Sequence, residues 1–183
     1  MSLVALSDVE AWLQLSFGNS DEALLTRLIN AASAFVETWC SRTFTATAYV
    51  EPRNGNGQTR VTPNSGPLIA VSSVLIDGTS IPATSVGATT NGFFVVGKSI
   101  YLRGYAFNRG EMNVVLSYTA GFATIPADVQ QAVIELVAMR YRERDRIGMS
   151  SVNAGGETTS YVIKDMPPSV ATLLTQYRVV VVR

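Results

Sequence analysis

The apolar residues in the first part of the chain recur at the three- and four-residue spacing of helices. Val9, Trp12 and Leu13 give a short first helix one buried face. A longer series continues as far as Cys40, with its apolar positions at Leu24, Leu25, Leu28, Ile29, Ala32, Phe35, Val36 and Trp39. This pattern predicts two helices joined by a short turn.

Beyond residue 43 the pattern changes to short alternating or β-branched segments, each bounded by a turn signal. The segments with strand character are 44–51, 59–62, 68–76, 79–82, 93–96, 99–103 and 112–118. Asn54-Gly55-Asn56-Gly57 predicts a flexible turn after which 59–62 returns, and Asp77-Gly78 predicts a tight hairpin turn. We therefore predict an α+β fold. A helical body of residues 1–43 and 120–183 carries a β-rich insertion, 44–119, that forms a small sandwich or barrel.

Residues 124–148 predict one long helix. Pro126 is tolerated in a first helical turn, and Gly148 offers a terminator. The apolar surface of this helix is wider than a simple stripe and comprises Val129, Ala132, Val133, Ile134, Leu136, Val137, Ala138, Tyr141 and Ile147. We expect the helix to be covered on more than one side, by its own domain or by a neighbouring subunit.

Four arginines lie near the end of this helix: Arg140, Arg142, Arg144 and Arg146. At ~100° per residue, Arg140 and Arg144 extend the face of Val129, and the other two arginines point in nearly the opposite direction. One interpretation is a self-neutralising ladder on a solvated face, in which Arg140 pairs with Glu143, Arg142 with Asp145, and Glu143 with Arg146. The other is that one arginine pair contacts a partner subunit or lines a path for a polyanion.

The last part of the chain combines a loop, a strand, a helix and a run of valines. Residues 149–157 are small and polar and predict a mobile loop, and 158–163 predict a strand arm. Pro167 and Pro168 suit the start of a final helix that ends at Tyr177. Four valines bracketed by Arg178 and Arg183 follow. They form either a last strand on this chain's own sheet or an addition to the sheet edge of a neighbouring protein.

Composition narrows the class of protein. At 183 residues the chain has room for one core with a sizeable insertion. Apolar residues make up 47% and charged residues only 15%, so the chain is globular and has little charged surface, which predicts burial by partners. The formal net charge of zero argues against binding a polyanion by bulk charge. The terminal valine run is far shorter than the ~20 residues that span a bilayer, so we expect no membrane partner.

The chain offers few residues for catalysis. Cys40 is the only cysteine and histidine is absent, which excludes a disulfide framework, the usual zinc spacings and the Ser-His-Asp and Cys-His arrangements within one chain. The acidic residues form no evident constellation. We therefore expect a protein that is not an enzyme, with no catalytic residue, no metal and no cofactor.

One segment matches the phosphate-binding loop pattern: Gly92-Phe93-Phe94-Val95-Val96-Gly97-Lys98-Ser99. In a phosphate-binding loop, a helix follows directly and its N-terminus faces the anion. Here the residues between the two glycines are β-formers, and the residues after Ser99 alternate. The segment therefore predicts a hairpin with Gly97-Lys98 at its turn, and nucleotide binding is rejected.

Six groups of residues occur in a fixed order along the chain. They are the opening LSDVEAWL and DEALLTRLINAASAFVETWCSR, then GPLIAVSSVLIDGTSIP, then NVVLSYTAGFATIPADVQQAVIELVAMRYRERDRIG, and the closing Ser160-Tyr161 and LLTQYRV. Together they resemble the head-tail connector, or adaptor, proteins of long-tailed bacteriophages. The resemblance spans nearly the whole chain, and the order of the segments is more specific than any single motif.

The resemblance implies a virion structural protein that forms a ring, expected to be dodecameric, beneath the portal protein in the neck between head and tail. Such a ring extends the channel through which genomic double-stranded DNA passes without sequence specificity, and it gives a platform to a stopper or tail-completion protein. Before assembly the subunit would be in the host cytoplasm. The alternatives are a head-completion, stopper or tail-completion role, or a DNA-binding module that uses the helix end at 140–146.

The resemblance also assigns candidate contacts. It makes two C-terminal segments portal-contact candidates: Ser160, Tyr161, Val162 and Ile163, and Tyr177, Arg178, Val179, Val180, Val181, Val182 and Arg183. It makes the four arginines of the long helix candidates for subunit contacts or for the wall of the DNA channel: Arg140, Arg142, Arg144 and Arg146.

Overall fold

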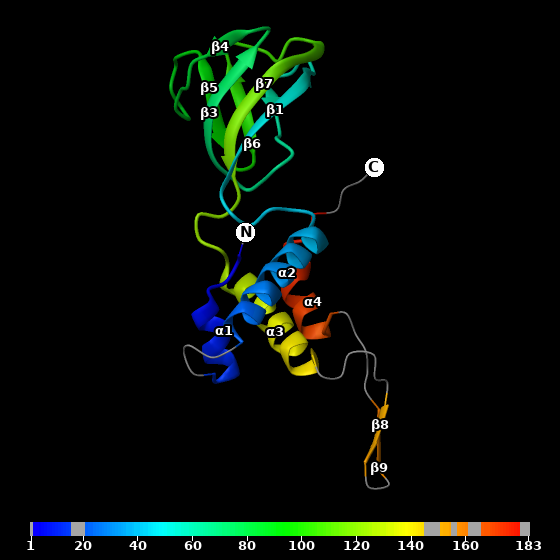
Figure 1. Cartoon of the computed structure of the whole chain (residues 1–183). Helices are drawn as coiled ribbons and strands as arrows, with labels where there is room; N and C mark the ends of the chain where they lie inside the picture. Colours follow the sequence, from blue (N-terminus) through cyan, green and yellow to red (C-terminus); the bar gives the residue numbers. More distant parts are fainter. Residues whose placement is uncertain (1, 16–20, 145–150, 155–156, 161–165, 180–183) are drawn as a thin grey trace. The chain divides into compact units, whose positions relative to one another are not determined.

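The computed structural model of the chain describes residues 2–15, 21–144, 151–154, 157–160 and 166–179 (Figure 1). The chain divides into two compact units, Met1–Arg42 with Ile125–Arg183, and Thr43–Thr124. The first unit contains all four described helices, and the second is built from strands. The predicted α+β class is confirmed.

The helical unit is organised around its third helix. Its elements are α1 (Leu6–Leu13), α2 (Glu22–Cys40), α3 (Ala127–Glu143) and α4 (Pro168–Thr175). Helix α3 contacts each of the other three (Figure 1). Its buried residues occupy well over half of its circumference and comprise Val129, Ala132, Val133, Ile134, Leu136, Val137 and Ala138. Because helices of the same unit cover α3, its broad apolar surface does not require a neighbouring subunit.

Two details of the helices differ from the sequence prediction. Helix α3 ends at Glu143, and Gly148 lies outside the described residues. Val9 is buried as expected, but Trp12, which was expected on the same face of α1, is 48% exposed, and α1 buries Glu10 instead. These two buried residues are ~100° apart, which turns the buried face away from Trp12. A helix of eight residues has too few apolar positions to fix the direction of that face from sequence.

The strands of the second unit form two open antiparallel sheets. One has the order β1-β7-β3-β4 and the other the order β2-β6-β5. Their bounds are Thr47–Gly55 (β1), Arg60–Val61 (β2), Leu68–Ile76 (β3), Thr79–Ile81 (β4), Gly92–Val96 (β5), Ser99–Arg103 (β6) and Gly110–Ala120 (β7). One buried cluster takes side chains from both sheets, including Val74 and Leu116 from the larger and Phe93 and Ile100 from the smaller. The unit is therefore a sandwich, and the barrel alternative is wrong.

The pairing of the first two strands also differs from the prediction. Segment 59–62 was expected to return along the first strand, but β1 pairs with β7, and β2 pairs with β6 in the other sheet. The segment between Asn54 and Gly57 therefore carries the chain from one sheet to the other. The long strand β7 pairs with β1 on one side and β3 on the other, and this extensive pairing outweighs a local hairpin.

The other two hairpin predictions are confirmed. Strands β3 and β4 pair around Asp77 and Gly78, which both have positive φ. Strands β5 and β6 pair from Gly92↔Arg103 to Val96↔Ser99, so Gly97-Lys98 is a hairpin turn. The segment that matches the phosphate-loop pattern thus continues into a strand, where a phosphate-binding loop would continue into a helix.

Strands also occupy part of the predicted C-terminal loop. Residues Ser151–Ala154 (β8) and Glu157–Ser160 (β9) form an antiparallel pair. The loop prediction for 149–157 is therefore wrong at β8, whereas the strand arm expected at 158–163 includes part of β9. The backbone pairing of β8 with β9 outweighs the small, polar composition that predicted a loop. Residues 161–163 lie outside the described part of the chain.

Candidate interaction site

The residues that follow α4 are fastened to the end of α2. The backbone N–H of Val179 donates to the carbonyl oxygen of Cys40 over 2.9 Å. The Arg178 guanidinium lies over the ring of Trp39, 5.2 Å from its centroid. We call Tyr177, Arg178 and Val179 the tail anchor, because their contacts fasten the residues after α4 to the end of α2.

Further hydrogen bonds hold the first residue of the tail anchor. The Arg42 Nη1 donates to the carbonyl oxygen of Tyr177 over 3.3 Å, and the Tyr177 hydroxyl donates to Asp128 Oδ2 over 3.4 Å. Burial raises the pKa of Tyr177, and the negative charge of Asp128 raises it further. Of the predicted portal-contact residues, the structure places the tail anchor here and Ser160 at the end of β9. Tyr161, Val162 and Ile163, and Val180, Val181, Val182 and Arg183, lie outside the described residues.

Cys40 has a structural role beside the tail anchor. Its side chain is fully buried, and burial raises the pKa of the thiol to about 11 against the opposing charges of Arg42 and Arg178. The thiol is therefore protonated at neutral pH, a state in which cysteine is a poor nucleophile.

A second set of contacts pins the end of α3 to the start of α2. The Tyr141 hydroxyl donates to Asp21 Oδ2, and Arg144 Nη2 lies 3.8 Å from the same carboxylate oxygen. The Arg144 guanidinium also lies over the Tyr141 ring, 4.0 Å from its centroid. The hydrogen bond to Asp21 raises the pKa of Tyr141. Arg144 is thus engaged within the chain.

Arg140 faces α2 as well, because its guanidinium lies 5.4 Å from the centroid of the Phe35 ring. The contacts of Arg140 and Arg144 therefore reach another helix, as their shared face on α3 predicts. Two of the three predicted ladder pairs involve Asp145 or Arg146, which lie outside the described residues. The described contacts of these two arginines favour an internal structural role.

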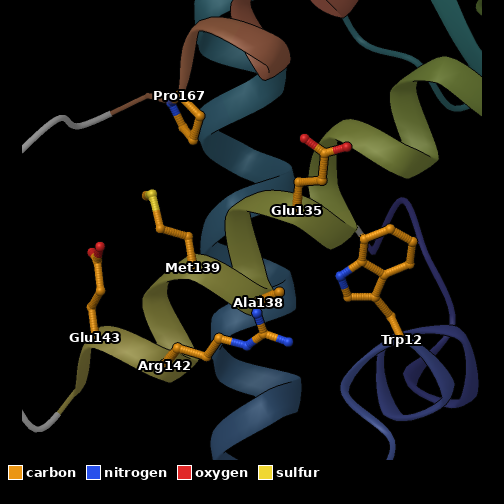
Figure 2. Close-up of a pocket in the computed structure, with 7 residues that line it drawn as sticks. All are labelled: Trp12, Glu135, Ala138, Met139, Arg142, Glu143 and Pro167. Atoms are coloured by element: carbon orange, nitrogen blue, oxygen red, sulfur yellow. The ribbon is translucent and has the colours of Figure 1, made fainter.

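Arg142 lies on the other side of α3, in a groove of about 410 Å³ (Figure 2). We call this groove the Trp12 groove. It is lined by Trp12, Glu135, Ala138, Met139, Arg142, Glu143 and Pro167. In Figure 2, Arg142 extends from α3 towards the side on which Trp12 of α1 lies. Arg140 and Arg144 therefore face α2, and Arg142 faces the Trp12 groove, so these three arginines lie in two environments as predicted.

The Trp12 groove combines apolar and charged side chains. Trp12, Met139 and Pro167 supply apolar surface, while Arg142 and Glu143 are exposed charges. Glu135 is held in place, since Ser169 Oγ and Gln131 Nε2 each donate to it over 3.1 Å. An exposed tryptophan beside an arginine is typical of protein-protein contacts. Sequence reasoning missed Trp12 because helical spacing placed it in the core.

The described residues contain no group of three or more His, Cys, Asp or Glu side chains that could hold a metal ion. Within the described part of the chain, every helix is too short or too polar to cross a membrane. The polar clusters described above join elements of one chain, and the Trp12 groove offers a contact surface.

Three solved structures that share this fold are from gene transfer agent (GTA) particles. The chain aligns with a subunit from the neck of an empty GTA particle, computed with C6 symmetry, at a TM-score of 0.62 and 20% identity over 99% of this chain and 92% of that chain. A subunit from the neck of a native GTA particle, computed with C12 symmetry, aligns at 0.59 and 19% identity over 100% and 96%. A chain from the virion of a native gene transfer agent aligns at 0.59 and 18% identity over 99% and 92%. These matches show a shared fold.

The fold therefore defines a class of proteins that share it with these neck and virion subunits. The family model described as head completion protein matches residues 2–180. The chain belongs to the head completion protein family, and the predicted resemblance is confirmed. Among curated proteins, none matches the chain.

Proposed function

We propose that this protein is a structural component of the virion neck, where copies form a ring beneath the portal protein. The observation that carries this proposal is that the matches extend over nearly the whole chain. A head completion family model matches residues 2–180, and the aligned neck subunits cover 99% or more of the chain. Both the helical and the strand unit are therefore part of the shared architecture. The ring extends the channel for double-stranded DNA and gives a platform to a stopper or tail-completion protein.

The C-terminal residues are the proposed portal contact. The tail anchor supports this role, because it holds the residues just before position 180 against the end of α2. Residues Val180, Val181, Val182 and Arg183 then supply β-branched side chains and a charge to a partner, with Ser160, Tyr161, Val162 and Ile163 as a second contact segment. Addition of such a segment to a sheet edge gains affinity from backbone hydrogen bonds.

The Trp12 groove is the proposed subunit contact. A ring interface joins two different faces of identical copies, so each copy needs one surface that receives its neighbour. Of the four arginines, Arg142 is exposed at this groove, whereas Arg140 and Arg144 already contact α2. Arg146 remains a candidate from sequence alone.

A chain that lacks residues 180–183 tests the portal contact. The deletion leaves the tail anchor in place, so we expect an unchanged fold by circular dichroism and a loss of attachment to DNA-filled heads that carry the portal. Replacement of Val86, an exposed apolar residue of the strand unit, by serine is the control and should preserve attachment. Undiminished attachment of the truncated chain would remove the portal assignment.

A stopper or tail-completion role is the second candidate, because the family description names head completion without naming the adaptor position. The order of assembly separates the two roles. An adaptor binds purified heads that carry only the portal, whereas a stopper binds only after an adaptor ring is present.

A further inference from the structure

One face of the three-stranded sheet carries a row of cations and aromatic rings. Arg60 of β2 pairs with Tyr101 of β6, and Tyr101 pairs with Phe94 of β5. Because their neighbours along these strands belong to the buried core, alternation turns these side chains outward. Arg103 lies two residues beyond Tyr101 and shares this face. We call Arg60, Phe94, Tyr101 and Arg103, with Lys98 at the hairpin turn, the basic sheet face.

The guanidinium groups on this face cover the aromatic rings. Phe94 and Tyr101 stack on each other with centroids 5.7 Å apart. The Arg60 guanidinium lies 5.8 Å from the Tyr101 centroid, and the Arg103 guanidinium lies 5.4 Å from the Phe94 centroid. The basic sheet face therefore presents positive charge above its rings, and the rings hold the guanidinium planes in position.

Stacking uses the flat face of a guanidinium and leaves its N–H donors around the edge. The Arg60 Nε donates to Ser99 Oγ over 3.3 Å, and its other donors are at the exposed end of the side chain. The Arg103 Nη1 is buried and has no hydrogen-bond partner among the described residues. Arg60 can therefore donate to an anionic acceptor outside the chain, and guanidinium N–H groups match phosphate oxygens, whereas Arg103 contributes its positive charge to this face.

Acidic residues are absent from the strands that carry this face. Strands β2, β5 and β6 and the turn at 97–98 contain Arg60, Lys98 and Arg103 but no Asp or Glu. Elsewhere in the strand unit, an arginine is neutralised by an acidic side chain: Arg53 Nε of β1 lies 3.2 Å from Glu51 Oε1. The positive charge of the basic sheet face is therefore not neutralised within its own sheet, although the whole chain is neutral.

We propose that the basic sheet face binds the phosphate backbone of double-stranded DNA without reading its sequence. A single strand would need free rings for stacking, whereas here the guanidinium groups lie over the rings. Three cations make binding weak and strongly salt-dependent, which permits DNA to move past. The proposed position in the neck enters this inference at one point only: it identifies the bound DNA as the genome that passes through the channel.

Duplex binding by the purified chain at low salt tests this inference. We expect fluorescence anisotropy of a labelled duplex of arbitrary sequence to give a plot of log K against log salt concentration with a slope of about −3, for three phosphate contacts. The double variant Arg60→Gln/Arg103→Gln should reduce this slope to about −1. Glutamine keeps a polar side chain of similar length, and circular dichroism checks that the sheet is intact.

The control variant Arg27→Gln/Arg109→Gln removes two exposed arginines that lie outside the basic sheet face and changes the net charge equally. It should bind duplex DNA like the unchanged protein. Equal weakening by the two double variants would attribute binding to bulk charge and overturn the inference. So would the absence of duplex binding, stronger binding to single-stranded DNA, or binding of poly-glutamate in place of DNA. None of these results would affect portal attachment, which tests the proposed function separately.

Discussion

Three tyrosine hydroxyls join parts of the chain that lie far apart in the sequence, each through a carboxylate. Tyr118 donates to Glu51 in the strand unit. In the helical unit, Tyr141 donates to Asp21 and Tyr177 donates to Asp128. Sequence patterning identified the tyrosines as apolar or terminal positions, but it could not pair them with their carboxylates, because such pairs depend on the tertiary fold.

These hydrogen bonds predict a loss of stability in alkali. The pKa of each of the three tyrosines lies above its ordinary value of 10.0, through burial for Tyr118 and Tyr177 and through the hydrogen bond to Asp21 for Tyr141. A raised pKa favours the protonated phenol in the folded state. The resulting stabilisation is complete below pH ~10 and is lost as the pH rises through the folded-state pKa. We expect the free energy of unfolding in urea to fall above pH ~10.

Tyr118→Phe should make this alkaline decline shallower, because one phenol that titrates differently in the two states is removed. Tyr105→Phe, at an exposed tyrosine, is the control and should leave the decline unchanged. If the free energy of unfolding falls equally steeply with pH in both variants, the ionisation of Tyr118 does not contribute to the loss of stability in alkali.

A substitution at Trp12 is expected to affect assembly much more than the stability of the fold. Because it is 48% exposed, Trp12→Ala should change the free energy of unfolding by only about 0.5 kcal/mol. If the Trp12 groove receives a neighbouring copy, the same variant should enter particles several-fold less well, as measured by quantitative blotting of purified virions. Normal incorporation would exclude the groove as a subunit contact, and a loss above about 2 kcal/mol would place Trp12 in the core.

At the scale of elements, local sequence patterns predicted which segments form helices and strands better than they predicted which strands pair. Helices α2 and α3, strand β3 and the two hairpins at Asp77-Gly78 and Gly97-Lys98 follow from spacing and turn residues that lie within a few positions. The pairing of β1 with β7 joins residues more than fifty positions apart, and no local signal specifies it. For the same reason, the sequence could not choose between a sandwich and a barrel.

Two glycines with positive φ provide a matched test of the strand unit. A Cβ at Gly121, where φ is +122°, would meet the carbonyl oxygen of Thr45 at 2.4 Å, whereas one at Gly87, where φ is +84°, would meet nothing within 4 Å. We expect Gly87→Ala to cost about 1–2 kcal/mol from backbone strain alone. Gly121→Ala should cost about 1–3 kcal/mol more, because the clash adds to the strain. Equal losses in chemical denaturation would show that the Thr45 carbonyl relaxes freely.

At the scale of the whole molecule, the formal net charge is zero, but the charged side chains are unevenly distributed along the chain. Residues 1–43 carry five acidic and two basic side chains, whereas 44–119 carry three acidic and five basic ones. The sequence revealed this imbalance, and a net charge of zero argued against a tight grip on a polyanion. Only the strand register brought Arg60 and Arg103 onto one face. The helix end at 140–146 was one of the sequence's candidates for contact with a subunit or with DNA, and two of its arginines are engaged with α2.

The position of the protein in intact particles is the most direct test of its proposed role. Electron cryomicroscopy of virions, with and without the gene for this chain, would locate both of its units if they are present. We predict a ring of copies between the portal and the tail, and DNA-filled heads without tails when the chain is missing. A complete neck in particles that lack the chain, or density for it elsewhere in the virion, would contradict the proposal.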